Sequence, residues 1–253
     1  VEVTAVDQFD LDEHEEPEAQ PAGQKYEEQI TVHWMSTSLA CPDARRRSRE
    51  AVMAGACDSR SIVTSSPVME ADKPAIRRRA KGTELAVVQL APVLGDLEAN
   101  LTAHLEAIED ARGAGAELVV FPELSLTGYR LKDTVPELAM STRDARLDPL
   151  KEASAGTALV FGMVEEAPDH RFFNSAVYLE DGAVVAVHRK VYLPTYGMFD
   201  EQRYFARGNR LAAFNTKLGR MALLVCEDML HPTALTVVAV DGASTVIVPS
   251  ASP

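Results

Sequence analysis

The sequence predicts an α/β fold in which buried strands alternate with helices. Two apolar runs of buried-strand length, residues 85–90 and 118–121, stand on either side of a helical segment. Between Leu97 and Ile108 the large apolar residues follow one another at spacings of 4, 4 and 3, which places them on one face of a helix. This strand–helix–strand pattern predicts two parallel neighbouring strands joined by a right-handed crossover.

The rest of the globular part is predicted to contain two hairpins and a second strand–helix–strand unit. Turn residues mark the hairpins, at Glu180-Asp181-Gly182 and at Leu218-Gly219. The last helix should begin near Pro232 and end by Gly242, before a final strand. The other predicted elements are an irregular stretch at 127–136, a helix at 143–155, and strands at 157–164, 175–179, 183–187, 211–214, 221–225 and 245–248.

The first 82 residues differ in pattern and are predicted to form a separate, mostly disordered segment. Their charges lie in blocks: eight acidic residues among the first twenty, then two arginine-rich clusters, with no sustained strand or helix period. The alternatives are an interaction tail, a short helix around residues 43–54, and a wrongly annotated start ahead of Met53 or Met69. We therefore divide the chain into a segment at residues 1–82 and a globular domain at residues 83–253.

Composition excludes several classes of function. The formal net charge of the 253 residues is −13, which makes nucleic acid and anionic membranes poor partners. No apolar run approaches the roughly 18 residues of a transmembrane helix. Cys41, Cys57 and Cys226 are too few for a disulfide scaffold, and the acidic first twenty residues lack the features of a signal peptide. The sequence favours a cytoplasmic protein in which Cys226 is a free thiol.

Three reactive side chains follow predicted strands: Glu123, Lys190 and Cys226. In α/β sheets, sites gather at the carboxyl ends of strands, so the three side chains could meet there. A carboxylate can take the proton of a thiol, the thiolate is a nucleophile, and an ammonium can stabilise an oxyanion. Together they suit covalent catalysis on an amide or nitrile. Taken singly, the cysteine also fits a small buried hydrophobe, and the other two fit solvated loop charges.

Each of these residues stands in a distinctive motif. The motifs are FPELSLTGY at 121–129, HRKVYLP at 188–194 and VCEDMLHP at 225–232. In order and spacing they resemble the glutamate, lysine and cysteine motifs of the nitrilase, or carbon–nitrogen hydrolase, superfamily. The resemblance covers residues 84–253, and three motifs in the right order carry far more weight than any one of them.

This resemblance implies an α-β-β-α sandwich with Glu123 as general base, Lys190 as stabiliser of the transition state and Cys226 as nucleophile. A thioester would form on Cys226, ammonia or an amine would leave, and water would release the acid. The family implies no metal and no organic cofactor for this step. Metal motifs such as HExxH and CxxC are also missing from the sequence.

Residues 193–205, LPTYGMFDEQRYF, carry a finer resemblance to the glutaminase domain of glutamine-dependent NAD synthetases. That resemblance implies that Tyr196 contacts the substrate and that Glu201 is a second glutamate beside Lys190. A carboxylate there would favour the charged form of the lysine. The alternative for Glu201 is a helix cap. The other candidates for substrate contact or support are Glu227 and Ser252, with Ser250 as the alternative to Ser252.

The sequence thus predicts an amidase-type hydrolase of non-peptide carbon–nitrogen bonds in a small molecule. The alternatives are the ammonia-supplying glutaminase part of a larger synthetase, an inactive scaffold and, with less support, a Cys226–His231 protease pair. The family domain continues well past the strand that follows the cysteine. We therefore expect the fold to be incomplete at the C-terminus and the last strand, 245–248, to be an uncovered edge. A homodimer is implied by the resemblance only.

Overall fold

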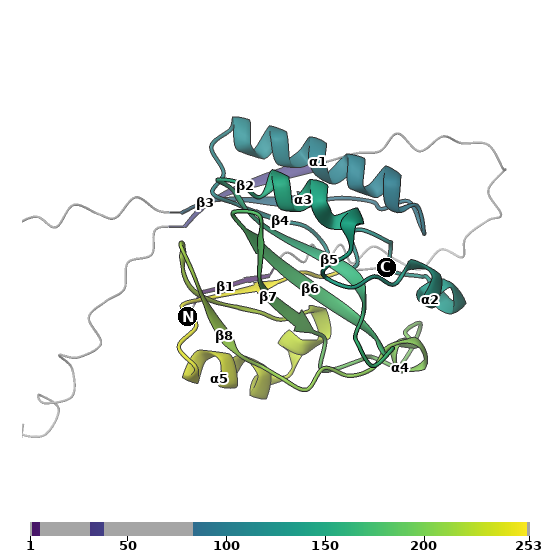
Figure 1. Cartoon of the computed structure of the whole chain (residues 1–253). Helices are drawn as coiled ribbons and strands as arrows, with labels where there is room; N and C mark the ends of the chain where they lie inside the picture. Colours follow the sequence, from purple (N-terminus) through teal and green to yellow (C-terminus); the bar gives the residue numbers. More distant parts are fainter. Residues whose placement is uncertain (1, 6–30, 38–82, 252–253) are drawn as a thin grey trace, which may run out of the picture. The chain divides into compact units, whose positions relative to one another are not determined.

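The computed structural model describes residues 2–5, 31–37 and 83–251, which form two β-sheets and the helices that cover them (Figure 1). One sheet has the strand order β1-β10-β9-β8 and the other β2-β3-β4-β5-β6-β7. The strands are β1 (Glu2–Ala5), β2 (Thr31–Thr37), β3 (Thr83–Gln89), β4 (Leu118–Val120), β5 (Ala158–Glu166), β6 (Phe172–Glu180), β7 (Ala183–Arg189), β8 (Ala213–Thr216), β9 (Gly219–Leu223) and β10 (Thr245–Val248). The α-helices are α1 (Leu97–Gly113), α2 (Val135–Leu138), α3 (Asp148–Ala153), α4 (Glu201–Tyr204) and α5 (Pro232–Val240), and the 3₁₀ helices are η1 (Lys132–Thr134), η2 (Ala145–Leu147) and η3 (Cys226–Leu230).

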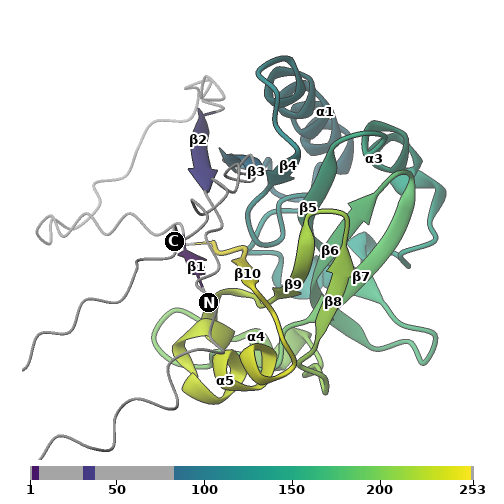
Figure 2. The same ribbon diagram turned by 90° about the vertical axis from the view of Figure 1, so that its left-hand side faces the viewer.

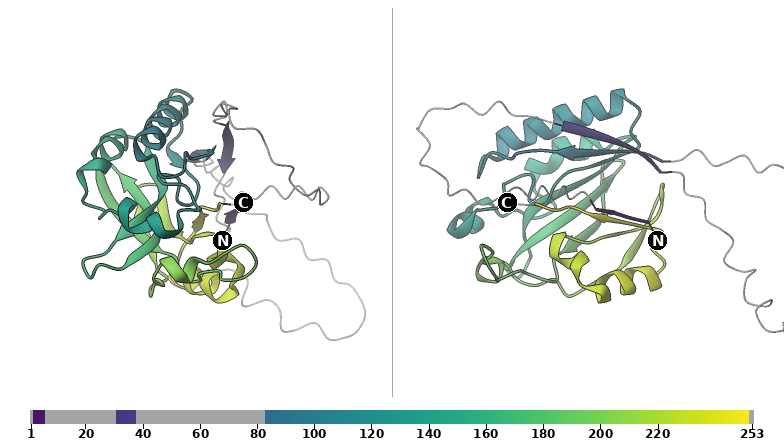
Figure 3. Two further views of the ribbon diagram at one scale, coloured as in Figure 1. Left: turned by 90° about the vertical axis from the view of Figure 1, so that its right-hand side faces the viewer. Right: turned by 180° about the vertical axis from the view of Figure 1, so that it is seen from behind.

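The alternation of side chains along β3 shows how the layers form. Leu85 and Val87 pack in one apolar cluster with residues of β9 and β10 from the other sheet. Ala86 and Val88 point the opposite way and pack with residues of α1. The two sheets therefore face each other across a shared core, while α1 and α3 cover one outer face and α5 the other (Figures 1, 2 and 3). This confirms the predicted α-β-β-α sandwich.

The structure confirms both predicted strand–helix–strand units and both hairpins. β3 and β4 are parallel neighbours, with Leu85 opposite Leu118, and α1 connects them. β9 and β10 are also parallel, and α5 connects them. The pairs β6–β7 and β8–β9 are antiparallel. The parallel strands bring their carboxyl ends to one edge of each sheet, where the loops that follow them lie.

The predicted helix at 143–155 is wrong in extent, because the chain forms two shorter helices there. Asp144 accepts a hydrogen bond from Arg146 N–H at 2.9 Å and begins η2. Pro149 stands in the first turn of α3, where its missing N–H costs no helical hydrogen bond. The proline therefore starts a new helix instead of continuing the preceding one. The stretch predicted as irregular, 127–136, contains η1 and the start of α2.

Two strands of residues 1–82 join the edges of the sheets, which the sequence pattern did not predict. β1 pairs in parallel with β10, from Glu2 opposite Thr245 to Ala5 opposite Val248, and β2 is the neighbour of β3. An unpaired edge offers rows of backbone donors and acceptors to any strand nearby. The expectation that β10 is an uncovered edge is therefore wrong. The remaining predictions for residues 1–82, including the helix at 43–54, lie outside the described residues.

Candidate active site

The structure brings Glu123, Lys190 and Cys226 into one cluster, in which Glu123 and Lys190 are buried and Cys226 is half-buried. Lys190 follows β7 directly, Glu123 lies three residues after β4, and Cys226 begins η3 after β9. The Nζ atom of Lys190 lies 2.8 Å from Oε1 of Glu123, and neither side chain has any solvent exposure. The charges of both act on the Cys226 thiol. Residues that are distant in sequence thus meet as predicted.

Both oxygens of Glu123 are hydrogen-bonded. Its Oε1 accepts hydrogen bonds from Nζ of Lys190 at 2.8 Å and from Nδ2 of Asn174 at 2.6 Å. Its Oε2 accepts a hydrogen bond from the backbone N–H of Ala251 at 3.0 Å. A carboxylate without solvent needs such donors, because burial of an unpaired charge costs far more than a lost hydrogen bond. The site therefore holds Glu123 in one fixed orientation.

The loop that carries Glu123 depends on a glycine in the adjacent strand. Leu124 has a positive φ of 50°, in the left-handed region that side chains rarely adopt. A Cβ atom at Gly162 of β5 would lie 2.1 Å from the backbone N of Leu124 and 2.8 Å from the backbone carbon of Glu123. Only glycine allows the two backbones to approach this closely.

A chain of hydrogen bonds ties the same loop to α1. The Nδ1–H of His104 donates to the carbonyl of Asn100 at 2.6 Å, so its Nε2 accepts from the hydroxyl of Ser125 at 2.9 Å. The Oγ of Ser125 accepts in turn from Gly162 N–H at 3.2 Å. Burial lowers the pKa of His104 to about 4, so the ring is neutral at neutral pH. The chain is buried and positions the loop.

Lys190 is held by a second carboxylate. Its Nζ lies 2.7 Å from Oε1 of Glu201, which also accepts a short hydrogen bond from the hydroxyl of Tyr129. Burial alone would lower the pKa of Lys190, but the carboxylates of Glu123 and Glu201 outweigh it and raise that pKa above its ordinary value. Burial, with the charge of Glu123, raises the pKa of Glu201. Lys190 is therefore cationic across the physiological range.

Cys226 sits at a strained turn. Its φ is +43°, an unusual value for a side chain other than glycine. Burial raises the pKa of the thiol to about 12, the charge of Glu123 adds to this, and Lys190 opposes it. Ser250 hydrogen-bonds the thiol and also lowers its pKa. The resting form is a protonated thiol, which requires a base to become a nucleophile.

Asp228 joins the cysteine turn to the lysine loop. Its Oδ1 accepts from the N–H groups of Val191 at 3.0 Å and Tyr192 at 2.8 Å. Its Oδ2 accepts from Val225 N–H at 3.0 Å and from Nε2–H of His188 at 2.7 Å. The Asp228 side chain is fully buried. All four acceptor positions of one carboxylate are thus used, to hold the backbone just after Lys190, the backbone just before Cys226 and the ring of His188.

The remaining candidates of the sequence analysis lie around this cluster, with one exception. The hydroxyl of Tyr196 donates to Oε2 of Glu227 at 2.7 Å, and Glu227 follows Cys226 in η3. His231 stacks on Tyr192 with ring centroids 3.6 Å apart, and its Nε2 lies 3.4 Å from Oε1 of Glu227. Ser252 lies outside the described residues. The hydroxyl that contacts Cys226 belongs to its alternative, Ser250.

Three residues around the cluster were not predicted from the sequence, and one of them, Asn174, contacts Glu123 directly. Tyr129 and Asp228 stand inside the glutamate and cysteine motifs, but only the structure shows that they bind Glu201 and the lysine loop. Asn174 belongs to β6 and carried no sequence signal, because a single polar residue in a buried strand has many uses. A signal for Asn174 exists only in three dimensions, where it donates to Glu123.

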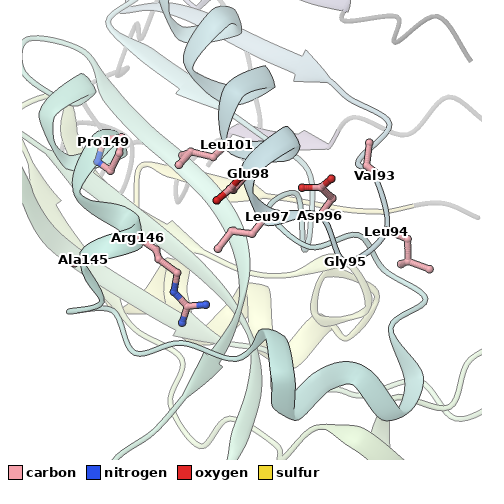
Figure 4. Close-up of a pocket in the computed structure, with 10 residues that line it drawn as sticks. All are labelled: Val93, Leu94, Gly95, Asp96, Leu97, Glu98, Leu101, Ala145, Arg146 and Pro149. Atoms are coloured by element: carbon pink, nitrogen blue, oxygen red, sulfur yellow. The ribbon is translucent and has the colours of Figure 1, made fainter.

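Two hollows of the described chain are candidates for a binding site. A wide, open one of about 740 Å³ lies between the start of α1 and the η2–α3 segment, and none of its lining residues belongs to the cluster (Figure 4). A smaller one of about 290 Å³ is lined by Tyr129, Phe199 and Glu201, among others. The smaller hollow borders the Lys190 ion pairs, so we associate it with the candidate site despite its size.

The residues that the structure describes contain neither a metal-binding cluster nor a membrane-spanning helix. No group of three or more His, Cys, Asp or Glu side chains there is arranged to hold a metal ion. No helix there is long and apolar enough to cross a membrane.

Comparison with known proteins gives consistent matches. The carbon–nitrogen hydrolase family model matches residues 84–253. A glutamine-dependent NAD(+) synthetase from Acinetobacter baylyi is 33% identical over 175 residues, which are 68% of this chain and 32% of that protein. The chain thus spans about a third of the length of this curated relative.

Two solved structures share the fold. Saccharomyces cerevisiae Nit3, a member of branch 10 of the nitrilase superfamily, is 25% identical with a TM-score of 0.60, over 67% of this chain and 65% of that one. A mutant of the amidase from Nesterenkonia sp. AN1 is 26% identical with a TM-score of 0.60, over 66% of each chain. In that amidase structure, acrylamide has added to the active-site cysteine.

Proposed function

Because the chain belongs to the carbon–nitrogen hydrolase family, we propose that residues 83–253 act as an amidase-type hydrolase of a small carboxamide. The observation that carries the proposal is the fully buried ion pair of Glu123 and Lys190, whose charges act on the thiol of Cys226. A buried base and a buried cation beside a half-buried thiol form the set that acyl transfer through a thiol requires.

The first half-reaction transfers the acyl group to sulfur. Glu123 takes the proton of the Cys226 thiol while the sulfur attacks the amide carbon and forms the carbon–sulfur bond. Lys190, cationic at neutral pH, stabilises the negative charge that develops on the carbonyl oxygen. Glu123 then gives its proton to the leaving nitrogen, the carbon–nitrogen bond breaks, and ammonia departs from a thioester.

The second half-reaction returns the enzyme to its starting state. Glu123 takes a proton from water while the water oxygen attacks the thioester carbon. The carbon–sulfur bond breaks, the proton passes to the Cys226 sulfur, and the carboxylic acid leaves. The buried, fixed carboxylate of Glu123 serves as base and acid in turn.

A second candidate function is glutamine hydrolysis that supplies ammonia to a synthetase. It is favoured by the 33% identity to a glutamine-dependent NAD(+) synthetase, which exceeds the 26% identity to the amidase. It is also favoured by Tyr196 and Glu227, whose hydrogen-bonded side chains adjoin Cys226 and could receive the polar end of an amino acid. Under this candidate the reaction at Cys226 is the same and only the amide differs.

Ammonia release tests the proposal and separates the two candidates. The full chain is incubated with glutamine, asparagine, propionamide and propionitrile. Hydrolysis of propionamide supports the amidase, whereas hydrolysis confined to glutamine supports the glutaminase.

Cys226→Ala should abolish ammonia release, and Glu123→Gln should lower kcat/KM by about 10²–10⁴-fold. Undiminished release by Cys226→Ala would remove the nucleophile assignment. Association into a homodimer stays a prediction for sedimentation to check.

A further inference from the structure

Asn174 contacts both members of the Glu123–Lys190 pair. It lies in β6 with 1% of its surface exposed, and its Nδ2 donates to Oε1 of Glu123 at 2.6 Å. Its backbone carbonyl accepts from the N–H of Lys190 at 2.9 Å. Its Oδ1 has no hydrogen-bond partner in the described part of the chain. One side-chain oxygen is thus left unpaired in the interior while the amide nitrogen points at Glu123.

The hydrogen bonds of Glu123 leave its two oxygens unequal. Each carboxylate oxygen can accept about two hydrogen bonds. Lys190 and Asn174 use both positions on Oε1, whereas Ala251 N–H uses only one on Oε2. The free position of the base is therefore on Oε2. Without Asn174, a second free position would open on Oε1, beside the Lys190 cation.

We propose that Asn174 is a positioning residue that holds the carboxylate of Glu123 in place and directs proton transfer from Cys226 to Oε2. The proposal rests on the proposed function, in which Glu123 is the base. A neutral N–H donor stabilises a carboxylate without adding a cation that would compete with Lys190 for Glu123 and Glu201. The unpaired Oδ1 fits this role, since the orientation of the amide is fixed by the carboxylate it serves and not by its other end.

The other groups that act on Glu123 cannot replace this donor. Lys190 already donates to Oε1 and to Glu201. Glu201 is a carboxylate that repels Glu123, and burial together with this repulsion raises the pKa of Glu201. The pKa of Tyr129 is raised by burial and by both carboxylates, so its hydroxyl stays protonated and is committed to Glu201. Cys226 is a thiol at neutral pH. Asn174 is thus the neutral side-chain donor to Glu123 among the described residues.

The isosteric change Asn174→Asp tests the proposal through pH. An aspartate oxygen in place of Nδ2 would lie close to Oε1 of Glu123, and two carboxylates at that distance share one proton. When the shared proton is present, the carboxyl group donates to Glu123 as asparagine does. When it is lost at higher pH, the donor becomes a charge that repels Glu123. Asn174→Ala removes the donor at every pH.

The probe is iodoacetamide, which reports on Cys226 without any amide substrate. The sulfur–carbon bond forms, the carbon–iodine bond breaks, iodide leaves, and the thiol proton passes to Glu123. Rates are measured on the full chain from pH 5 to 9 by mass spectrometry of the peptide that contains Cys226, because the chain also contains Cys41 and Cys57. If no amide is hydrolysed, the proposed function fails while this comparison still tests Asn174.

We expect Asn174→Ala to slow alkylation by about 10–100-fold, which corresponds to the free energy of one hydrogen bond to a charged group. The fall of the alkylation rate at low pH should also begin at a higher pH than in the native protein. We expect Asn174→Asp to match the native rate near pH 5 and to lose it as pH rises. Ser175→Ala is the matched control. It removes a 2.7 Å hydrogen bond from the same strand to another buried carboxylate, Glu165, and should keep the native profile.

Two results would overturn the proposal. One is a native rate profile in both Asn174 variants. The other is an equal loss in both variants at every pH, which would show a merely structural role. Melting curves establish folding first. If Asn174→Ala does not fold, Asn174→Ser replaces it, because its shorter hydroxyl cannot span the distance to Glu123 but fills part of the space.

Discussion

The loop that carries Glu123 and the turn that carries Cys226 are held in different ways. The Glu123 loop is fixed by several neutral contacts, with His104 on α1, Ser125 within the loop and Gly162 on β5. Beside the Cys226 turn one carboxylate, Asp228, accepts four hydrogen bonds, one from Val225 in the turn and three from His188 and the lysine loop. Distributed contacts should tolerate the loss of one member better than a single hub does.

The largest loss of stability is expected from substitution of Asp228. Asp228→Ala leaves three backbone N–H groups, one buried and two partly buried, and the buried His188 ring without their acceptor. We therefore expect a loss of about 4 kcal/mol in the free energy of unfolding. Urea unfolding measures it. Asp169→Ala, which removes an exposed ion pair with Arg171, is the control and should leave that free energy close to its native value. Similar losses of unfolding free energy in the two variants would show that Asp228 does not hold the cysteine turn and the lysine loop.

The next largest effect is a loss of stability in acid, which we expect from the buried His104 that contacts the Glu123 loop. Burial holds the pKa of His104 at about 4, against 6.5 for the exposed residue. Below pH 6.5 the unfolded chain takes up a proton that the folded chain refuses, so stability falls as pH drops to about 4. The loss is about 3 kcal/mol. Urea unfolding at pH 7 and pH 4.5 should show a smaller difference in His104→Gln than in the native protein.

A somewhat smaller effect is expected where the loop meets β5. Gly162→Ala places a Cβ within 2.1 Å of a backbone atom, and the forced shift should cost about 2–3 kcal/mol of stability. It should also displace Glu123 and slow the alkylation of Cys226. Gly113→Ala is the matched control, since a Cβ there meets nothing within 4 Å. Equal losses of stability in the two glycine variants would contradict the close approach of the β5 backbone to the Glu123 loop.

The smallest loss of stability is expected from substitution of Ser125, one of the several contacts that hold the Glu123 loop. Ser125→Ala breaks the link between His104 and Gly162, and we expect a loss of about 1–2 kcal/mol in unfolding free energy. The double variant Ser125→Ala with His104→Gln should lose less than the sum of the two single losses, because both act on one hydrogen bond. Additive losses would show that the two side chains act independently.

The sequence predicted the layers because they arise from local pattern. Alternation along β3 and the 3–4 spacing along α1 require nothing beyond neighbouring residues, and the three motifs are short. The strand β1 and the break at Pro149 were missed, since pairing at a sheet edge and the division of one helix into two depend on tertiary contacts. Asn174 was missed for the same reason: its partner Glu123 lies 51 residues away.

The most direct test of the account is to trap the acyl group. The full chain is mixed with the amide that it hydrolyses fastest, quenched in acid within one turnover, and digested for mass spectrometry. The account predicts an added acyl mass on the peptide that contains Cys226, no such mass in Cys226→Ala, and slower formation in Glu123→Gln. Hydrolysis that proceeds at the native rate in Cys226→Ala, or an acyl mass on a different residue, would contradict it.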